Sequence, residues 1–253
     1  MLTVKSPAKV NLTLDVLGKD SAAGYHFVQT ILHEAPLHDE ITFEESTTLT
    51  LTCDNPDVPS DDSNTILRAA RLLQAHTKTS RGARIHLSKK IPLASGLGGP
   101  ASNAATTLKA LSQLWGLNLT EKELLNLAKQ IGMDVPFFIR GGCAVGMHYG
   151  EQVMSLPTLD QFGLEIELVL TGIQRSAAEA YTALDLTQCG AQNKETGQLV
   201  KILKGERDYA GPKQIEALLH NDFSQLQKEP DQMHLSGKGG AMFRLSRVRG
   251  GEN

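Results

Sequence analysis

The chain has 253 residues, of which 25 are Lys or Arg and 28 are Asp or Glu, so its formal net charge is −3. This length is ample for a hydrophobic core and fits one large domain or two small ones. Apolar residues make up 40% and charged residues 21%, which excludes wholesale disorder. The near-neutral balance of charge predicts no nucleic-acid partner and no attraction to an anionic membrane.

Two further features predict a soluble protein of the cytoplasm. The first residues, MLTVKSPAKVNL, lack the apolar stretch and the cleavage site of a signal peptide, and no run of about 18 apolar residues could span a bilayer. Cys53, Cys143 and Cys189 are widely spaced and odd in number, which supports neither a disulfide framework nor a zinc site.

In the first half of the chain, the sequence predicts strands that alternate with helices. Val10, Leu12, Leu14 and Val16 alternate with other residues, which predicts a half-buried strand over 10–17 that ends at Gly18. Further strands are predicted in ITFEE, TLTLTC and RIHLS and at 143–149.

Capping residues predict where the helices of this half begin. Ser63 or Asn64 precedes the helical pattern ILRAARLLQA, and Thr120 with Glu123 forms a capping box for ELLNLAKQIG, which ends at Gly132. A third helix follows a glycine-rich loop. Its predicted inward face is Ala104, Ala105, Leu108, Leu111 and Trp115.

A second region is predicted beyond residue 155, which gives domains at 1–155 and 156–253, the second one abbreviated. LEIELVL reads as a buried strand, and Ser176 with Glu179 forms a capping box for AAEAYTALD. KQIEALLHNDF carries a helical pattern, whereas FRLSRVRGGEN is typical of a frayed basic tail.

The glycine-rich loop PLASGLGGPASNAA lies between a predicted strand and a predicted helix. Its glycines let backbone N–H groups face a ligand without obstruction by Cβ atoms, and the helix N-terminus adds partial positive charge. This combination suits a phosphate, although neither GxxxxGK[ST] nor GxGxxG is present. On glycine content alone, a tight turn without a ligand is the alternative.

The string PxxxGLGxxxSxAA in this loop resembles the phosphate-binding loop of the GHMP kinases, a family of small-molecule kinases. The strings PAKVNL, GYH, GMDVPFF, SAAEAY, NDF and SGKG follow the family in order, so the resemblance covers nearly the whole chain. It implies a two-domain α+β fold with the active site in the cleft between the domains. It also implies ATP-dependent phosphorylation of the 2-hydroxyl of a diphosphocytidyl alcohol, in the non-mevalonate route to isoprenoids.

The resemblance implies that ATP binds on the glycine-rich loop, with Mg²⁺ bridging its β- and γ-phosphate oxygens. The implied ATP-binding residues are Pro92, Ala94, Ser95, Gly96, Leu97, Gly98, Gly99, Pro100, Ala101, Ser102 and Asn103. The sequence does not identify protein ligands for the metal.

Asp134 and Lys9 are the candidate catalytic residues. Asp134 stands among apolar residues, and Pro136 biases Val135 toward an extended conformation. Without the resemblance, Asp134 could equally cap the next segment, and Lys9 would be an ordinary surface lysine. The resemblance implies that Asp134 is the base and that Lys9, just before the first strand, pairs with it and attracts the γ-phosphate or the nucleophilic oxygen.

The resemblance also implies a substrate site made of Asn11, Tyr25, His26 and Tyr181. Tyr25 would stack on the cytosine, His26 would bond the edge of the base, and Tyr181 would be a second aromatic plate. From the residues alone, a turn whose Tyr packs on the sheet and whose His is exposed is the alternative.

Four departures from the family pattern leave other functions open. Pro100 and Ala101 replace a glycine or serine followed by serine, Lys238 replaces a small residue, and the stretch 225–234 is short. A kinase for another small alcohol, or a nucleotide-binding homologue with weak or no kinase activity, therefore stays an alternative. The expected partners are ATP and the small cytidyl substrate, bound by a monomer or homodimer.

Overall fold

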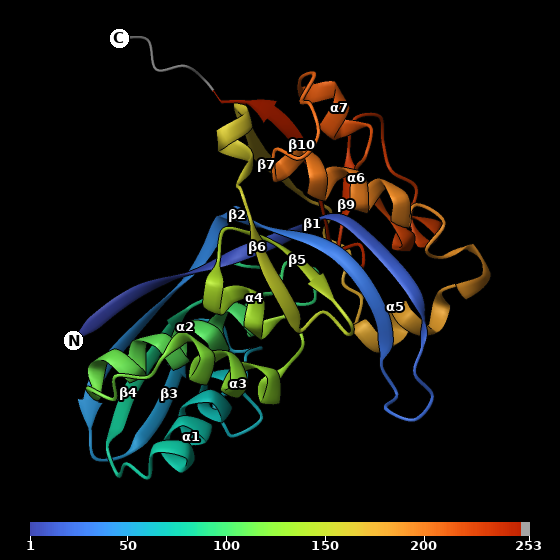
Figure 1. Ribbon diagram of the computed structural model, residues 1–253. Helices are drawn as coiled ribbons and strands as arrows, with labels where there is room; N and C mark the ends of the chain where they lie inside the picture. The colour runs from blue at the N-terminus through green and yellow to red at the C-terminus, as the bar shows by residue number, and fades with distance from the viewer. Residues whose placement is uncertain (249–253) are drawn as a thin grey trace. The chain divides into compact units, whose positions relative to one another are not determined.

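The computed structural model describes residues 1–248 (Figure 1). Their contacts form two compact units. Unit 1 comprises Met1–Ala8, Leu37–Pro92 and Gly98–Arg140, and unit 2 comprises Lys9–Pro36, Leu93–Leu97 and the chain from Gly141 onward. Each unit thus draws on several stretches of the chain. The unbroken domains expected at 1–155 and 156–253 stay a prediction.

Unit 1 combines strands with a group of helices. β3 (Leu49–Cys53) pairs in parallel with β4 (Gly82–Ser88), and β4 pairs antiparallel with the second half of β2 (His26–Ser46). The helices, which pack against one another, are α1 (Thr65–Thr77), α2 (Gly99–Leu114), α3 (Glu121–Ile131) and α4 (Val135–Arg140). The buried core of this unit includes Ile41, Phe43, Leu73, Leu87, Leu108, Leu111 and Phe137.

Unit 2 contains two groups of strands. In the first, β5 (Cys143–Met147) pairs antiparallel with the first half of β2 and with β6 (Gln152–Leu156), and the second part of β1 (Leu2–Lys19), from Lys9 onward, pairs in parallel with β8 (His220–Asn221). The second group is antiparallel, in the order β7 (Leu164–Leu170), β10 (Ala241–Arg247) and β9 (His234–Ser236).

Short helices complete unit 2. They are α5 (Ala177–Ala183), α6 (Asn193–Leu203) and α7 (Pro212–Glu216), with 3₁₀ turns at Leu159–Phe162, Leu186–Gln188 and Asp222–Leu226. A buried apolar cluster joins β1, β2 and the second strand group. Its members include Leu14, Val16, Val28, Phe223, Leu235 and Met242.

The predicted helix starts are confirmed. The side chain of Asn64 caps α1, and both capping boxes are complete, with Thr120 and Glu123 opening α3 and Ser176 and Glu179 opening α5. The predicted inward face of α2 is buried along its whole length. Capping and apolar periodicity were reliable guides in these segments because both act within a few residues.

Two predictions in the first half are wrong in extent or conformation. β1 begins at Leu2 and ends at Lys19, so it is about twice as long as the strand predicted over 10–17. Val135 is not extended but is the first residue of α4. Pro136 then lies in the first helical turn, where a missing N–H costs no intrahelical bond.

The last part of the chain differs more from the predicted helices and strands. The helical pattern KQIEALLHNDF yields only α7, followed by β8 and a 3₁₀ turn. The predicted frayed tail is wrong as far as Arg247, because β10 pairs on both sides and buries Phe243, while Arg244 forms an ion pair with Glu167. The rest of that tail, 249–253, lies outside the described residues. Helix α6 was not predicted, since Gly197 interrupts its pattern.

Candidate active site

Lys9 lies within β1 in unit 2, and only 5% of it is exposed. Its backbone N–H donates to the carbonyl of Leu97 at 2.9 Å, which ties this point of the strand to the glycine-rich loop. Its Nζ donates to Oδ1 of Asn11 at 2.6 Å. The alternative that Lys9 is an ordinary surface lysine is therefore wrong, and so is its expected place just before the first strand, because it lies inside β1.

Asn11 is fixed by hydrogen bonds from both ends of its amide. Residues two apart in a strand share a face, so Asn11 lies next to Lys9 on β1. While Oδ1 accepts from Lys9, Nδ2 donates to Oγ1 of Thr30 at 2.8 Å, and this hydroxyl donates to the carbonyl of Thr13 at 2.6 Å. Sequence reasoning missed Thr30. Its signal is a hydroxyl in a row that otherwise holds Val28 and Leu32.

The part of the glycine-rich loop that belongs to unit 2, 93–97, packs against the turn 236–240. A Cβ on Gly240 would lie 2.2 Å from Cα of Ser95, and a Cβ on Gly237 would lie 2.8 Å from the carbonyl oxygen of Gly96. Gly96 itself has a φ of +78°, in the left-handed region. Only glycines allow this approach of two backbones, so the structure brings together two motifs that are more than 140 positions apart.

Arg175 joins the same two segments and was missed at the sequence level. Its backbone N–H donates to the carbonyl of Ala94 at 3.5 Å, and one guanidinium nitrogen donates to the carbonyl of Lys238 at 3.2 Å. Lys238, the departure from the family pattern, therefore contributes its backbone to the anchoring of this turn.

The remainder of the loop begins α2 in unit 1. Gly98, at a φ of +75°, is the N-cap and has no side chain to bond the first N–H groups of the helix. Pro100 lies in the first turn, which a proline tolerates. Ser102 and Asn103 are buried, and the hydroxyl of Ser6 forms a 2.7 Å hydrogen bond with each of them. Their side chains thus tie the start of α2 to the first part of β1, which belongs to the same unit.

Asp134 occupies the turn between α3 and α4 in unit 1 and is half-buried. The helix that follows it is buried from Val135 to Ile139. Lys109 of α2 donates to the carbonyl of Phe138 at 2.9 Å, near the end of this helix. A packed helix of this kind holds the backbone of Asp134 in one place, as a positioned carboxylate requires.

The predicted aromatic substrate residues form two stacked pairs in unit 2. His26 stacks on Tyr181 with ring centroids 4.5 Å apart and planes 16° apart. Tyr25 stacks on Tyr149, a ring that sequence reasoning missed, at 5.1 Å and 29°. Burial lowers the pKa of His26, and the charge of Lys19 lowers it further, which favours a neutral imidazole with one donor and one acceptor nitrogen.

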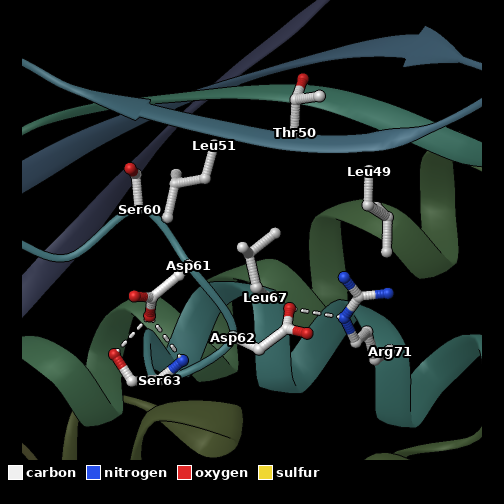
Figure 2. Close-up of a pocket in the computed structure, with 9 residues that line it drawn as sticks. All are labelled: Leu49, Thr50, Leu51, Ser60, Asp61, Asp62, Ser63, Leu67 and Arg71. Carbon is white, nitrogen blue, oxygen red and sulfur yellow. Dashed lines mark hydrogen bonds and ion pairs between the residues drawn. The ribbon is translucent and has the colours of Figure 1, made fainter.

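A pocket of about 550 Å³ lies in unit 1 (Figure 2). Its lining residues are Leu49, Thr50, Leu51, Ser60, Asp61, Asp62, Ser63, Leu67 and Arg71. Its charged groups already have partners, because Arg71 pairs with Asp62 at 2.7 Å and Asp61 accepts two hydrogen bonds from Ser63. None of the predicted site residues lines it.

Residues 1–248 lack two features that would indicate other functions. No helix there has both the length and the apolar character needed to cross a membrane. No group of three or more His, Cys, Asp or Glu side chains there is arranged to hold a metal ion.

Comparison with known proteins decides the family. A family model described as the GHMP kinases N terminal domain matches residues 64–142. A 4-diphosphocytidyl-2-C-methyl-D-erythritol kinase of Chloroherpeton thalassium is 34% identical, over 95% of this chain and 88% of its own length. The chain belongs to the 4-diphosphocytidyl-2-C-methyl-D-erythritol kinase family of GHMP kinases. The predicted resemblance is confirmed.

Solved structures agree with this assignment. A crystal structure of 4-(cytidine 5'-diphospho)-2C-methyl-D-erythritol kinase has a TM-score of 0.72 and 26% identity, and the alignment covers 97% of this chain and 90% of that one. A mevalonate kinase has a TM-score of 0.69 at 17% identity, covering 98% and 92%, and so shares the fold. These likenesses confirm the predicted α+β fold of the GHMP kinases.

Proposed function

We propose that this protein transfers the γ-phosphate of ATP to the 2-hydroxyl of 4-diphosphocytidyl-2-C-methyl-D-erythritol, in the non-mevalonate route to isoprenoids. Membership of the family makes it an ATP-dependent small-molecule kinase. The environment of Lys9 is the main support for the proposed catalytic residues. Lys9 is buried, and it forms hydrogen bonds through its backbone to Leu97 and through Nζ to Asn11. A fixed lysine beside a phosphate loop suits phosphoryl transfer.

ATP fits the segment from Pro92 to Asn103 because of its backbone. Gly96 and Gly98 lie in the left-handed region, and the N-cap of α2 brings no side chain of its own to the first N–H groups of the helix. Such N–H groups and the helix dipole favour a phosphate. Mg²⁺ bound with the nucleotide supplies positive charge at the β- and γ-phosphate oxygens.

Asp134 is the proposed general base. It accepts the proton of the 2-hydroxyl while the hydroxyl oxygen bonds to the γ-phosphorus and the bond from phosphorus to the bridging oxygen of ADP breaks. Lys9 stabilises the negative charge on the transferring group and keeps Asp134 ionised. Both roles come from the family resemblance.

The proposed substrate-binding residues contact two different ends of the substrate. Tyr25 stacks on the cytosine, His26 bonds the edge of the base, and Tyr181 is the second plate. In this structure His26 stacks on Tyr181, so the two rings leave no room for a base between them. The cytosine therefore either displaces one of these two rings or binds on the exposed side of the Tyr25 ring. Asn11, held by Lys9 and Thr30, binds the part of the substrate nearest the transferred phosphate.

Identification of the product tests this proposal. Purified protein is incubated with ATP, Mg²⁺ and the diphosphocytidyl substrate, and the product is analysed by mass spectrometry and phosphorus NMR. We expect ADP and a new phosphomonoester on the 2-oxygen. ATP consumption without a phosphorylated substrate would contradict the assignment.

We further propose that the protein works in the cytoplasm, as a monomer or homodimer that needs no nucleic acid or membrane. The family's small-molecule substrates support this view. Light scattering after size-exclusion chromatography measures the mass in solution, and a larger assembly would contradict it.

A further inference from the structure

An additional aromatic residue, Tyr149, stacks on one face of the Tyr25 ring. Tyr149 lies in the turn between β5 and β6, and it stacks on Phe27 at 5.4 Å and 27° as well as on Tyr25 at 5.1 Å and 29°. Tyr25 is nevertheless 47% exposed. Its ring therefore has one supported face and ample area left for a ligand.

Asp20 fixes both the ring of Tyr149 and the turn that carries Tyr25. The hydroxyl of Tyr149 donates to Oδ2 of Asp20 at 2.6 Å. Oδ1 of Asp20 accepts from the backbone N–H groups of Ala22 and Ala23, and the N–H of Asp20 donates to the carbonyl of Tyr25 at 2.8 Å. One carboxylate thus connects two segments that are 129 positions apart in the chain.

Glu151 holds the other side of this arrangement. One of its carboxylate oxygens accepts from the backbone N–H of Tyr149 at 3.0 Å, and the other lies 2.8 Å from Nδ1 of His148. The carbonyl of His148 in turn accepts from the backbone N–H of Val28 at 2.7 Å, in β2. The position of the Tyr149 ring is therefore set by its backbone and by its hydroxyl.

The hydrogen bond between Tyr149 and Asp20 persists through neutral pH. It lowers the pKa of Asp20 and raises the pKa of Tyr149 to about 12, so the carboxylate stays ionised and the phenol stays protonated. A hydrogen bond from a neutral phenol to an ionised carboxylate is of the stronger kind.

We propose that Tyr149, held by Asp20, is a positioning residue that keeps the Tyr25 ring ready to stack on the nucleobase of the substrate. The inference rests on the proposed function, in which Tyr25 contacts the cytosine. A half-exposed ring on a turn loses rotational freedom when a base stacks on it, and a ring already stacked from behind loses less. The gain appears in the binding of the cytidyl substrate and not in the chemical step.

The test compares Tyr149→Leu with Tyr149→Phe, which keeps the stack and loses the hydroxyl. We expect Tyr149→Leu to raise the KM for the cytidyl substrate about five- to tenfold, the scale of one aromatic pair. The KM for ATP and kcat at saturating substrate should stay within about twofold. Tyr149→Phe and Asp20→Asn should show smaller increases. Tyr209→Leu, which removes an aromatic ring packed on Phe162, is the matched control and should change none of these values.

A double variant separates positioning from a general structural role. If Tyr149 acts through Tyr25, Tyr149→Leu should have no further effect on the KM for the cytidyl substrate in a Tyr25→Ala background. An equal effect in both backgrounds, or an equal rise in the KM for ATP, would overturn the inference. A wild-type KM in Tyr149→Leu, beside a raised KM in Tyr25→Ala, would also overturn it but leave the proposed function standing. If Tyr25→Ala itself leaves the KM for the cytidyl substrate unchanged, the proposed role of Tyr25 fails and this inference fails with it, whereas the proposed phosphoryl transfer is tested separately by the product.

Discussion

At the scale of single residues, the burial of Lys9 is what indicates that its side chain has a functional role. A lysine that is only 5% exposed is unfavourable unless polar partners surround its ammonium group, and Asn11 supplies one of them at 2.6 Å. Asn11 is in turn held by Thr30. A network of polar side chains in the buried part of β1 is costly to stability, and such costs concentrate at functional sites.

Replacing Asp134 by Asn should lower kcat by about two to four orders of magnitude, because the amide cannot accept the proton. The folded structure and ATP affinity should persist, since the side chain precedes α4 and is not part of its buried core. Steady-state kinetics measures the first effect, and calorimetry with a non-hydrolysable ATP analogue measures the second. A fully active Asp134→Asn enzyme would remove Asp134 as the base.

Lys9→Ala should lower kcat to a similar extent. Its effect should not add to that of Asp134→Asn, because we propose that the two side chains act together in the same step. The double variant should therefore be about as active as the worse single variant. Lys9→Met, which keeps the length of the stem, controls for lost packing. If the fold-losses in kcat multiply, the two residues act independently.

Tyr25→Ala should weaken binding of the cytidyl substrate by about 1–3 kcal/mol, the usual range for one stack of a base on an aromatic ring. Its affinity for ATP should hardly change. His26→Ala should chiefly reduce the preference for cytidine over uridine, since a bonded base edge rejects the wrong donor–acceptor pattern. Titrations with the cytidyl and uridyl forms measure both effects. Unaltered base preference in both variants would exclude this pocket.

At the scale of elements, close backbone contact between the loop 93–97 and the turn 236–240 depends on Gly240. Gly240→Ala places a Cβ about 2.2 Å from Cα of Ser95 and must push the two segments apart. We expect weaker binding of ATP and a lower Tm. Gly197→Ala is the matched control, because its Cβ meets nothing within 4 Å inside α6. That change should stabilise the protein by about 0.5–1 kcal/mol. Equal ATP affinity in both variants would contradict this account of the loop.

His220 links β8 to β1 and α6 and should make stability depend on pH. Its Nε2 lies 3.0 Å from Oδ1 of Asp15 and 3.3 Å from Oγ1 of Thr196. Burial opposes the charged imidazole, but the hydrogen bond to Asp15 and the charges of Asp15 and Asp222 outweigh it, so the pKa of His220 is raised. Its stabilisation is then complete below the unfolded pKa of about 6.5 and is lost as pH rises through the folded pKa.

Urea unfolding of the wild type and of His220→Gln at several values of pH from 5 to 9 tests this link. The difference in the free energy of unfolding should be largest at low pH and should shrink as pH rises. A difference that stays constant, or grows with pH, would show that the pKa of His220 is not raised.

The elements also show which parts of the structure the sequence could predict. Capping boxes at Thr120 and Ser176 are local, and both were predicted correctly. β10 and the burial of Lys9 depend on pairing with distant segments, and the residues themselves carry no sign of those partners. Tyr149 was missed for the same reason, since its partner Asp20 is far away in the chain. The family motifs indicated the candidate residues, and the roles of these residues stay predictions.

At the scale of the whole molecule, two of the departures from the family pattern, Pro100 and Lys238, fit the local structure of the loops that contain them. Pro100 fits the first turn of α2, and Lys238 lies in the turn whose flanking glycines meet Ser95 and Gly96. The fold is shared with a mevalonate kinase, so it does not select the substrate. Close relatives and the turn that carries Tyr25 favour the cytidyl alcohol over other small alcohols.

The most direct test of the central claim measures ADP release by the purified protein with ATP and Mg²⁺ and three alcohols in parallel. These are 4-diphosphocytidyl-2-C-methyl-D-erythritol, mevalonate and homoserine, and Asp134→Asn serves as the control for contaminating kinases. We predict turnover with the cytidyl substrate, with kcat/KM at least about a hundredfold above either other alcohol, and loss of that turnover in Asp134→Asn. Preferred turnover of mevalonate or homoserine, or no turnover of the cytidyl substrate by a folded protein that binds ATP, would contradict the account.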